Sequence, residues 1–216
     1  MNLETTTARI ESKFISGNKG LNSFLWLIKN NGFIRSYPNR RVNSLYYDNP
    51  QMSCIKDNLA GITPRKKYRL RWYGDPQNKE NGLRFEKKIK LGLTGVKEIL
   101  RFNNDMDPMQ LDYTIKGLQK ISNCYDESLL PTQFFPQLIC SYERQYFENA
   151  NSVRLTLDSK IRFWSVRNNI NNYLKQPIGS NFNILEVKFE PNKKTELLSF
   201  FRQLPFPSTR CSKYLL

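Results

Sequence analysis

Charged side chains occupy every second position in six segments of this chain, and most of them are basic. In the clearest segment, Lys67, Arg69 and Arg71 share one face of an extended strand, and apolar residues share the other. The remaining segments carry Arg9, Glu11 and Lys13; Arg84, Glu86, Lys88 and Lys90; Tyr142 and Arg144; Arg154, Thr156 and Asp158; and Glu186, Lys188 and Glu190. A face built from Arg and Lys is suited to phosphate, which the planar guanidinium binds through two hydrogen bonds.

The same alternation also arises in an antiparallel sheet with one solvated face, which commonly carries long charged side chains. Like charges directly opposite each other on neighbouring strands are unfavourable, however. Six mainly cationic segments together therefore favour a polyanion that offsets this repulsion.

Carboxylates occur among these cations, and they indicate a metal site in addition to the binding of an anion. In the segment Asn183 to Phe189, the apolar residues Leu185 and Val187 must pack against helices, so that Glu186 and Lys188 point to the opposite, concave side. Carboxylate oxygens there are suitable ligands for Mg²⁺ or Mn²⁺, which bridge protein oxygens to phosphate oxygens.

The amino-acid composition indicates an anionic partner and excludes several kinds of catalytic site. The 216 residues include 34 Lys and Arg against 19 Asp and Glu, giving a net charge of +15, so an anionic partner is expected: nucleic acid, polyphosphate, a nucleotide or an acidic membrane surface. The chain has no histidine, and its four cysteines show no C-x-x-C spacing. A zinc site and a Ser-His or Cys-His nucleophile are therefore excluded.

The amino terminus lacks the basic start and apolar run of a signal peptide. No stretch approaches the roughly 18 apolar residues of a membrane-spanning helix. We therefore expect a cytoplasmic protein with reduced thiols and no transmembrane segment, for which membrane recruitment would require an unidentified partner protein.

Hydrophobic periodicity predicts about eight strands and four helices in a single α+β domain, residues 1–216, because no long linker divides the chain. Closure of the sheet into a barrel would remove its exposed edges. The predicted helices begin near residue 21 and at 51, 109 and 193, and the predicted strands cover about 8–15, 42–48, 65–73, 83–91, 138–147, 153–157, 161–164 and 183–189. The tail around Arg210 to Tyr214 is expected to close over the sheet.

Six short strings occur in the order seen in a known family: Ser44 to Asn49, Arg69 to Gly74, Tyr142 to Arg144, Val153 to Asp158, Leu185 to Lys188 and Ser212 to Tyr214. Nearly the whole chain thereby resembles the VTC domain, the polyphosphate polymerase domain of the vacuolar transporter chaperone complex. That domain is a member of the triphosphate tunnel metalloenzyme (CYTH-like) superfamily.

The resemblance implies a closed eight-stranded antiparallel β-barrel with helices packed on the outside, whose lumen binds ATP and polyphosphate. It implies Mn²⁺ or Mg²⁺ on Glu186, with Glu11 as a second candidate ligand. The implied reaction transfers the γ-phosphoryl group of ATP to a growing polyphosphate chain. By similarity the catalytic set is Lys13, Arg69, Arg71, Lys88, Arg144, Arg154, Glu186 and Lys213, supported by Tyr142, Lys188 and Arg210.

One departure bears on the activity. Hydrolytic and cyclase branches of the superfamily carry Glu-x-Glu-x-Lys on the first strand, whereas this chain has Arg9-Ile10-Glu11-Ser12-Lys13. The loss of one metal-binding carboxylate favours the polymerase branch. A metal-dependent triphosphatase on the same barrel, and a non-catalytic binder of polyphosphate or RNA, remain alternatives. No DNA partner is expected, and an open nucleic-acid-binding sheet would place aromatic residues among the cations for base stacking.

Overall fold

The computed structural model describes residues 3–4, 9–74, 83–92, 94–101, 131, 133–166 and 176–216. Most of them lie in β-strands. The elements are β1 (Leu3–Glu4), β2 (Ile10–Gly17), α1 (Gly20–Asn30), β3 (Ile34–Asp48), α2 (Ser53–Ala60), β4 (Arg65–Tyr73), β5 (Arg84–Leu91), β6 (Thr94–Arg101), β7 (Phe135–Glu148), β8 (Arg154–Ser165), β9 (Ile178–Gly179), β10 (Phe182–Phe189), η2 (Pro191–Lys193) and α4 (Leu198–Gln203).

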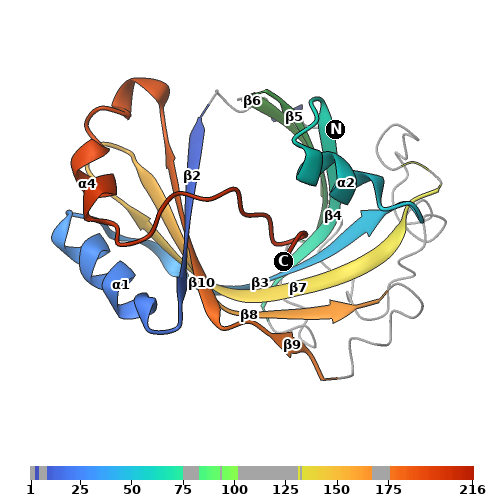
Figure 1. The fold of residues 1–216 in the computed structure, drawn as a ribbon, viewed down its shortest axis with the longest axis horizontal. Coiled ribbons are helices and arrows are strands. Elements are labelled where there is room, and N and C mark those ends of the chain that lie inside the picture. The colour runs from blue at the N-terminus through green and yellow to red at the C-terminus, as the bar shows by residue number, and fades with distance from the viewer. Residues whose placement is uncertain are drawn as a thin grey trace.

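These strands form one ten-stranded sheet, in the order β1-β6-β5-β4-β3-β7-β8-β10-β2, with β9 paired to β8. The pairings are antiparallel. Figure 1 shows that the sheet curves strongly, so that β2 at one end comes round toward β5 and β6 at the other. The concave side of this curve faces the middle of the molecule.

The expected closed eight-stranded barrel is wrong. Among the described residues, strand β2 pairs with β10 but not with β5 or β6, so the sheet is open between its two ends. A cavity of about 780 Å³ lies at this seam, with Ser12 of β2 and Lys90 of β5 both in its wall. Side chains bridge the ends instead, because Lys88 Nζ of β5 lies 3.5 Å from Glu11 Oε2 of β2.

The C-terminal segment provides the backbone partner that β2 lacks on its open edge. Phe14 forms an isolated antiparallel bridge with Ser208, and the amide of Thr209 donates to the carbonyl of Lys13 at 2.8 Å. From there the chain enters the concave side, as the red segment of Figure 1 shows. The Tyr214 hydroxyl donates to Asp48 Oδ2 at 2.9 Å, and its ring stacks on Tyr46 with centroids 4.9 Å apart. The predicted closing tail is confirmed.

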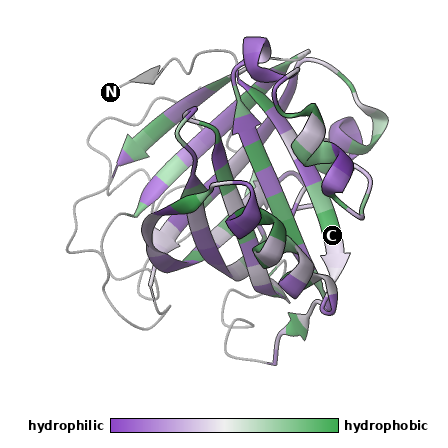
Figure 2. Cartoon of the chain, turned by 90° about the vertical axis from the view of Figure 1, so that its left-hand side faces the viewer, coloured by the Kyte–Doolittle hydropathy of each residue, from purple (hydrophilic) through white to green (hydrophobic). Residues whose placement is uncertain are grey.

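Helices α1 and α4 pack on the convex face, as the sequence predicts. Phe24 and Ile28 of α1 and Phe200 of α4 share a buried cluster with Leu185 and Val187 of β10. Figure 2 shows the apolar and polar residues alternating along the strands. Glu186 and Lys188 therefore face the concave side, away from these helices.

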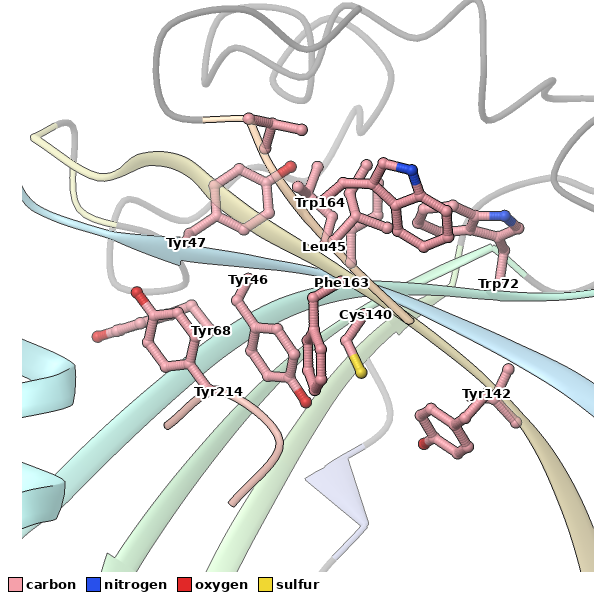
Figure 3. Close-up of a cluster of buried hydrophobic side chains, with 14 of the residues drawn as sticks. Leu45, Tyr46, Tyr47, Tyr68, Trp72, Cys140, Tyr142, Phe163, Trp164 and Tyr214 are labelled. Atoms are coloured by element: carbon pink, nitrogen blue, oxygen red, sulfur yellow. The ribbon is translucent and has the colours of Figure 1, made fainter. Parts of the chain in front are cut away.

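A second cluster covers the middle of the sheet and contains most of its large aromatic side chains (Figure 3). Figure 3 places Tyr47 and Trp164 on one side of the strands and Tyr46 and Tyr142 on the other. On the concave side, the Tyr46 ring stacks on Tyr214 of the C-terminal segment.

The predicted elements differ from the observed ones in a few places. Strand β3 begins at Ile34, eight residues earlier than predicted, and the two predicted strands over 153–164 form the single strand β8. Strand β6 was not predicted, because the glycines Gly92 and Gly95 interrupt its pattern. The helix predicted from residue 109 lies outside the described residues. The predicted helix from 193 is divided into η2 and the short α4.

Candidate functional site

The concave face gathers charged side chains from β2, β4, β5, β6, β7, β8 and β10, together with Lys213 of the C-terminal segment. They form three connected groups, each arranged around carboxylates that are largely buried. In two of these groups a single carboxylate faces several cations.

The first group surrounds Glu86 of β5, whose side chain is 1% exposed. Its Oε2 atom lies 2.5 Å from Nη2 of Arg69 and 3.9 Å from Nη1 of Arg71. Its Oε1 atom lies 2.9 Å from both Nε of Arg84 and Nζ of Lys97. Burial raises the pKa of Glu86, but these four cations outweigh that effect and hold it far below its usual value. One carboxylate for four cations leaves an excess of positive charge.

The second group surrounds Asp158 of β8, which is fully buried. Arg144 of β7 binds it through two hydrogen bonds, Nε to Oδ1 at 2.6 Å and Nη2 to Oδ2 at 2.8 Å. Lys213 Nζ donates to Oδ2 at 2.5 Å. The Tyr142 ring contacts both cations, with its centroid 5.2 Å from Arg144 Cζ and 4.5 Å from Lys213 Nζ. The C-terminal segment is thereby fixed inside the curved sheet.

The third group contains two carboxylates, Glu11 of β2 and Glu186 of β10. Lys13 Nζ lies 2.7 Å from Glu11 and 3.7 Å from Glu186, and Lys188 Nζ lies 2.7 Å from Glu186. Burial and the charge of Glu186 both raise the pKa of Glu11, but the surrounding ammonium groups outweigh them and lower it to about 2. Burial also opposes ionisation of Glu186, whose pKa is nevertheless held well below its usual value by Lys188 and Lys13. Both carboxylates are therefore charged at neutral pH.

Two lysines of this face, Lys67 and Lys97, have lowered pKa values. Burial, together with the neighbouring Lys13 and Lys88, lowers the pKa of Lys67 to about 7. Its Nζ atom donates to the Ser212 hydroxyl at 2.8 Å, and within the described residues no carboxylate lies within ion-pair distance of it. Burial likewise lowers the pKa of Lys97 to about 8, despite the attraction of Glu86. An anion bound here would relieve this repulsion.

The residues present fit a hard divalent cation that keeps part of its coordination for water and substrate. Glu11 and Glu186 supply ionised oxygen ligands close to one ammonium group. In the described part of the chain no three His, Cys, Asp or Glu side chains come together to hold a metal. A pair of carboxylates suits Mg²⁺ or Mn²⁺, which are commonly held by one or two carboxylates plus substrate phosphates.

Most of the residues predicted from the sequence come together on this face. Lys13, Arg69, Arg71, Arg144, Glu186 and Lys213 lie in the three groups, as do the support residues Tyr142 and Lys188. Lys88 reaches the edge of the third group, with about half of its side chain exposed. Arg154 lies at the start of β8, more than half exposed and 3.5 Å from Glu148. Arg210 is exposed beside Gly61 and joins none of the groups.

Several charged residues of the concave face were not among the site residues predicted from the sequence. Lys67 and Arg84 follow the same alternation as their selected neighbours, so periodicity alone could have included them. Lys97 lies on the unpredicted strand β6, where no such signal was available. Glu86 and Asp158 are the internal counter-ions, and only the cross-strand contacts reveal that role.

A strongly curved antiparallel sheet with a cationic concave face is the arrangement that the resemblance to triphosphate tunnel, CYTH-like proteins leads us to expect. Within that class, the VTC domain family model matches residues 8–216. The chain belongs to the VTC domain family. No curated protein sequence matches it.

Solved structures share the fold at low sequence identity. HpAC1 from Hippeastrum, described as having a dominant triphosphatase activity, is 13% identical with a TM-score of 0.57, and the match covers 95% of this chain and 92% of that one. A candidate adenylate cyclase from Bacillus halodurans is 11% identical with a TM-score of 0.58 and 96% coverage of both chains. The PH1819 protein from Pyrococcus horikoshii is 15% identical with a TM-score of 0.55 and the same coverage.

No helix in the described ranges has the length and apolar character needed to span a membrane.

Proposed function

We propose that this protein is a polyphosphate-polymerase-like phosphotransferase that moves the γ-phosphoryl group of ATP onto a growing polyphosphate chain. The observation that carries the proposal is the pair of ionised carboxylates, Glu11 and Glu186, within a concave face otherwise dominated by cations. Membership of the VTC domain family supports the same activity.

In this proposal the cations do most of the catalytic work. Arg69, Arg71, Arg144 and Lys213 hold phosphate oxygens, and Lys13 lies beside the carboxylate pair where charge develops on the transferred group. Phosphoryl transfer needs little covalent assistance, since positioning and neutralisation of charge account for most of the rate enhancement. Glu186 and Glu11 would hold a divalent ion, which would supply stabilisation of the negative charge on the phosphates. The more exposed residues Arg154, Lys88 and Arg210 would contact the part of the polyphosphate chain that lies nearer the solvent.

A metal-dependent inorganic triphosphatase is the second candidate. The fold similarity to HpAC1, for which triphosphatase activity is described, favours it. The residue Arg9 argues against a triphosphatase. It is exposed and replaces the first glutamate of the Glu-x-Glu-x-Lys pattern, which would provide a further metal ligand in a two-metal hydrolase.

The products formed from ATP distinguish these candidates. The purified chain is incubated with ATP and Mn²⁺ or Mg²⁺, and the phosphates are resolved on a gel. The polymerase proposal predicts long polyphosphate together with ADP, and loss of both in Arg69→Ala, Arg71→Ala and Glu186→Ala. Orthophosphate alone, from ATP or tripolyphosphate, would favour the triphosphatase. Tight binding of polyphosphate without turnover would leave only a binding protein.

A further inference from the structure

A group of tyrosines and arginines continues the concave face beyond its charged groups. It consists of Tyr37 and Arg40 of β3, Tyr73 of β4, Arg84 of β5 and Tyr146 of β7, and we call it the tyrosine–arginine patch. In β4, the residues Tyr68, Leu70 and Trp72 alternate with the cations and lie on the opposite face. In this patch, by contrast, aromatic rings lie among the cations.

Strand register places the patch next to the phosphate-binding cations. Tyr146 follows Arg144 on the same face of β7, about 7 Å further along the strand. Tyr73 follows Arg71 in the same way on β4. Arg84 joins the two regions, because its Nε lies 2.9 Å from Glu86 Oε1 while its Nη2 donates to the Tyr73 hydroxyl. A ligand held by Arg71 and Arg144 would therefore extend directly onto the patch.

The rings of the patch are arranged around cations and around each other. The Tyr73 ring contacts two guanidinium groups, with its centroid 5.1 Å from Arg84 Cζ and 5.8 Å from Arg40 Cζ. Tyr146 and Tyr37 meet edge to face with centroids 5.8 Å apart. Burial raises the pKa of Tyr146, and the charges of Arg144 and then Arg40 act against this. Arg144 Cζ lies 6.0 Å from the centroid of the Tyr146 ring, so the patch adjoins the cations of the second group.

Two members of the patch present free surface. Tyr37 is 55% exposed, and Arg40 is exposed with no carboxylate at ion-pair distance among the residues described. A polyphosphate chain has no π-face, so aromatic rings add little to its binding. A nucleobase gains from both groups, since stacking on an aromatic ring or a guanidinium contributes about 1–3 kcal/mol per base.

We propose that the tyrosine–arginine patch binds the nucleobase of a nucleoside triphosphate whose phosphates lie on the cationic concave face. This inference rests on the proposed function for the identity of the substrate. It assigns Tyr37 and Arg40 to stacking on the base, with Tyr73 and Tyr146 supporting them. Tripolyphosphate, which lacks a base, gains nothing from the patch.

Binding measurements on the full chain test the assignment without requiring turnover. Dissociation constants for ATP and for tripolyphosphate are measured by calorimetry in EDTA. Replacement of the exposed ring in Tyr37→Ala is expected to weaken ATP binding about 5-fold or more, which corresponds to the low end of the stacking range. Tripolyphosphate binding is expected to change less than about 2-fold, and Tyr37→Phe, which keeps the ring, should retain the ATP affinity. Trp26→Ala, at a 64% exposed residue of α1 on the convex side, is the control for a lost surface aromatic.

An unchanged ATP affinity in Tyr37→Ala would overturn the proposal. Equal weakening of ATP and tripolyphosphate binding would overturn it as well, because the patch would then act on phosphate or on the structure. Failure of the proposed polymerase activity is a separate outcome: it appears in the product gel, whereas selective loss of ATP affinity appears in calorimetry.

Discussion

Oε2 of Glu86 lies 2.5 Å from Nη2 of Arg69, in a position where the carboxylate is almost completely buried. The same carboxylate faces three further cations. Glu86 therefore acts as an internal counter-ion that holds the cationic face together in the absence of substrate. A bound phosphate chain would share these cations with it.

Removing this counter-ion should destabilise the protein in a way that phosphate can reverse. Glu86→Gln leaves four cations uncompensated, and breaking a buried charge pair costs about 3–5 kcal/mol. Thermal unfolding in dilute buffer should show this loss, and tripolyphosphate should raise the melting temperature of the variant more than that of the wild type. Glu98→Gln is the matched control, since it removes a 3.0 Å ion pair with Lys87 in the same two strands. An equal response to tripolyphosphate in both variants would contradict the counter-ion role.

The carboxylate pair should be needed for turnover more than for binding. Glu186→Gln and Glu11→Gln each remove one candidate metal ligand. Each variant should lower metal-dependent turnover about 100-fold or more, because the ion supplies several kcal/mol of charge stabilisation. The affinity for tripolyphosphate, measured in EDTA without metal, should be unchanged or higher, because negative charge has been removed beside the phosphates. Glu190→Gln, an exposed carboxylate just beyond β10, should leave both quantities unchanged. Loss of metal-free binding in the Glu variants would point to a structural role instead.

Binding of tripolyphosphate should be accompanied by uptake of protons near neutral pH. The pKa of Lys67 is lowered to about 7 and that of Lys97 to about 8, so at pH 8 Lys67 is largely neutral and Lys97 about half protonated. A bound polyanion favours the charged forms and raises both pKa values. Calorimetry at pH 8 in two buffers of different ionisation enthalpy measures this uptake, which should fade at pH 6, where both lysines are already protonated. Lys67→Met should reduce the uptake, whereas Lys56→Met on α2 should not.

The C-terminal segment should contribute measurably to stability through one hydroxyl. Tyr214→Phe removes the hydrogen bond to Asp48, a carboxylate that also accepts from the amides of Cys54 and Ile55. Hydrogen bonds to charged groups contribute about 1.5–3 kcal/mol, and chemical denaturation should show a loss of that size. Tyr37→Phe is the control, since its ring is largely exposed. A loss below about 0.5 kcal/mol would mean that the other contacts of the segment hold it, such as those of Lys213 with Asp158 and of Thr209 with Lys13.

The sequence by itself determines which side chains share a face, because the two-residue period of a strand is a local property. The alternation therefore predicted that Arg69 and Arg71 share a face and that Glu186 points away from the helices. The ordered strings indicated the family. The alternation could also have included Lys67 and Arg84, which obey the same period.

Tertiary structure alone decides how distant strands meet. The open seam depends on whether β2 pairs with β5 and β6 or with the segment at Ser208, and long-range packing rather than local pattern selects between them. The contact of Lys88 with Glu11 across that seam, and those of Lys213 with Asp158 and of Tyr37 with Tyr146, follow from register and curvature. No periodicity in a single segment encodes these cross-strand distances, which depend on how the whole sheet curves.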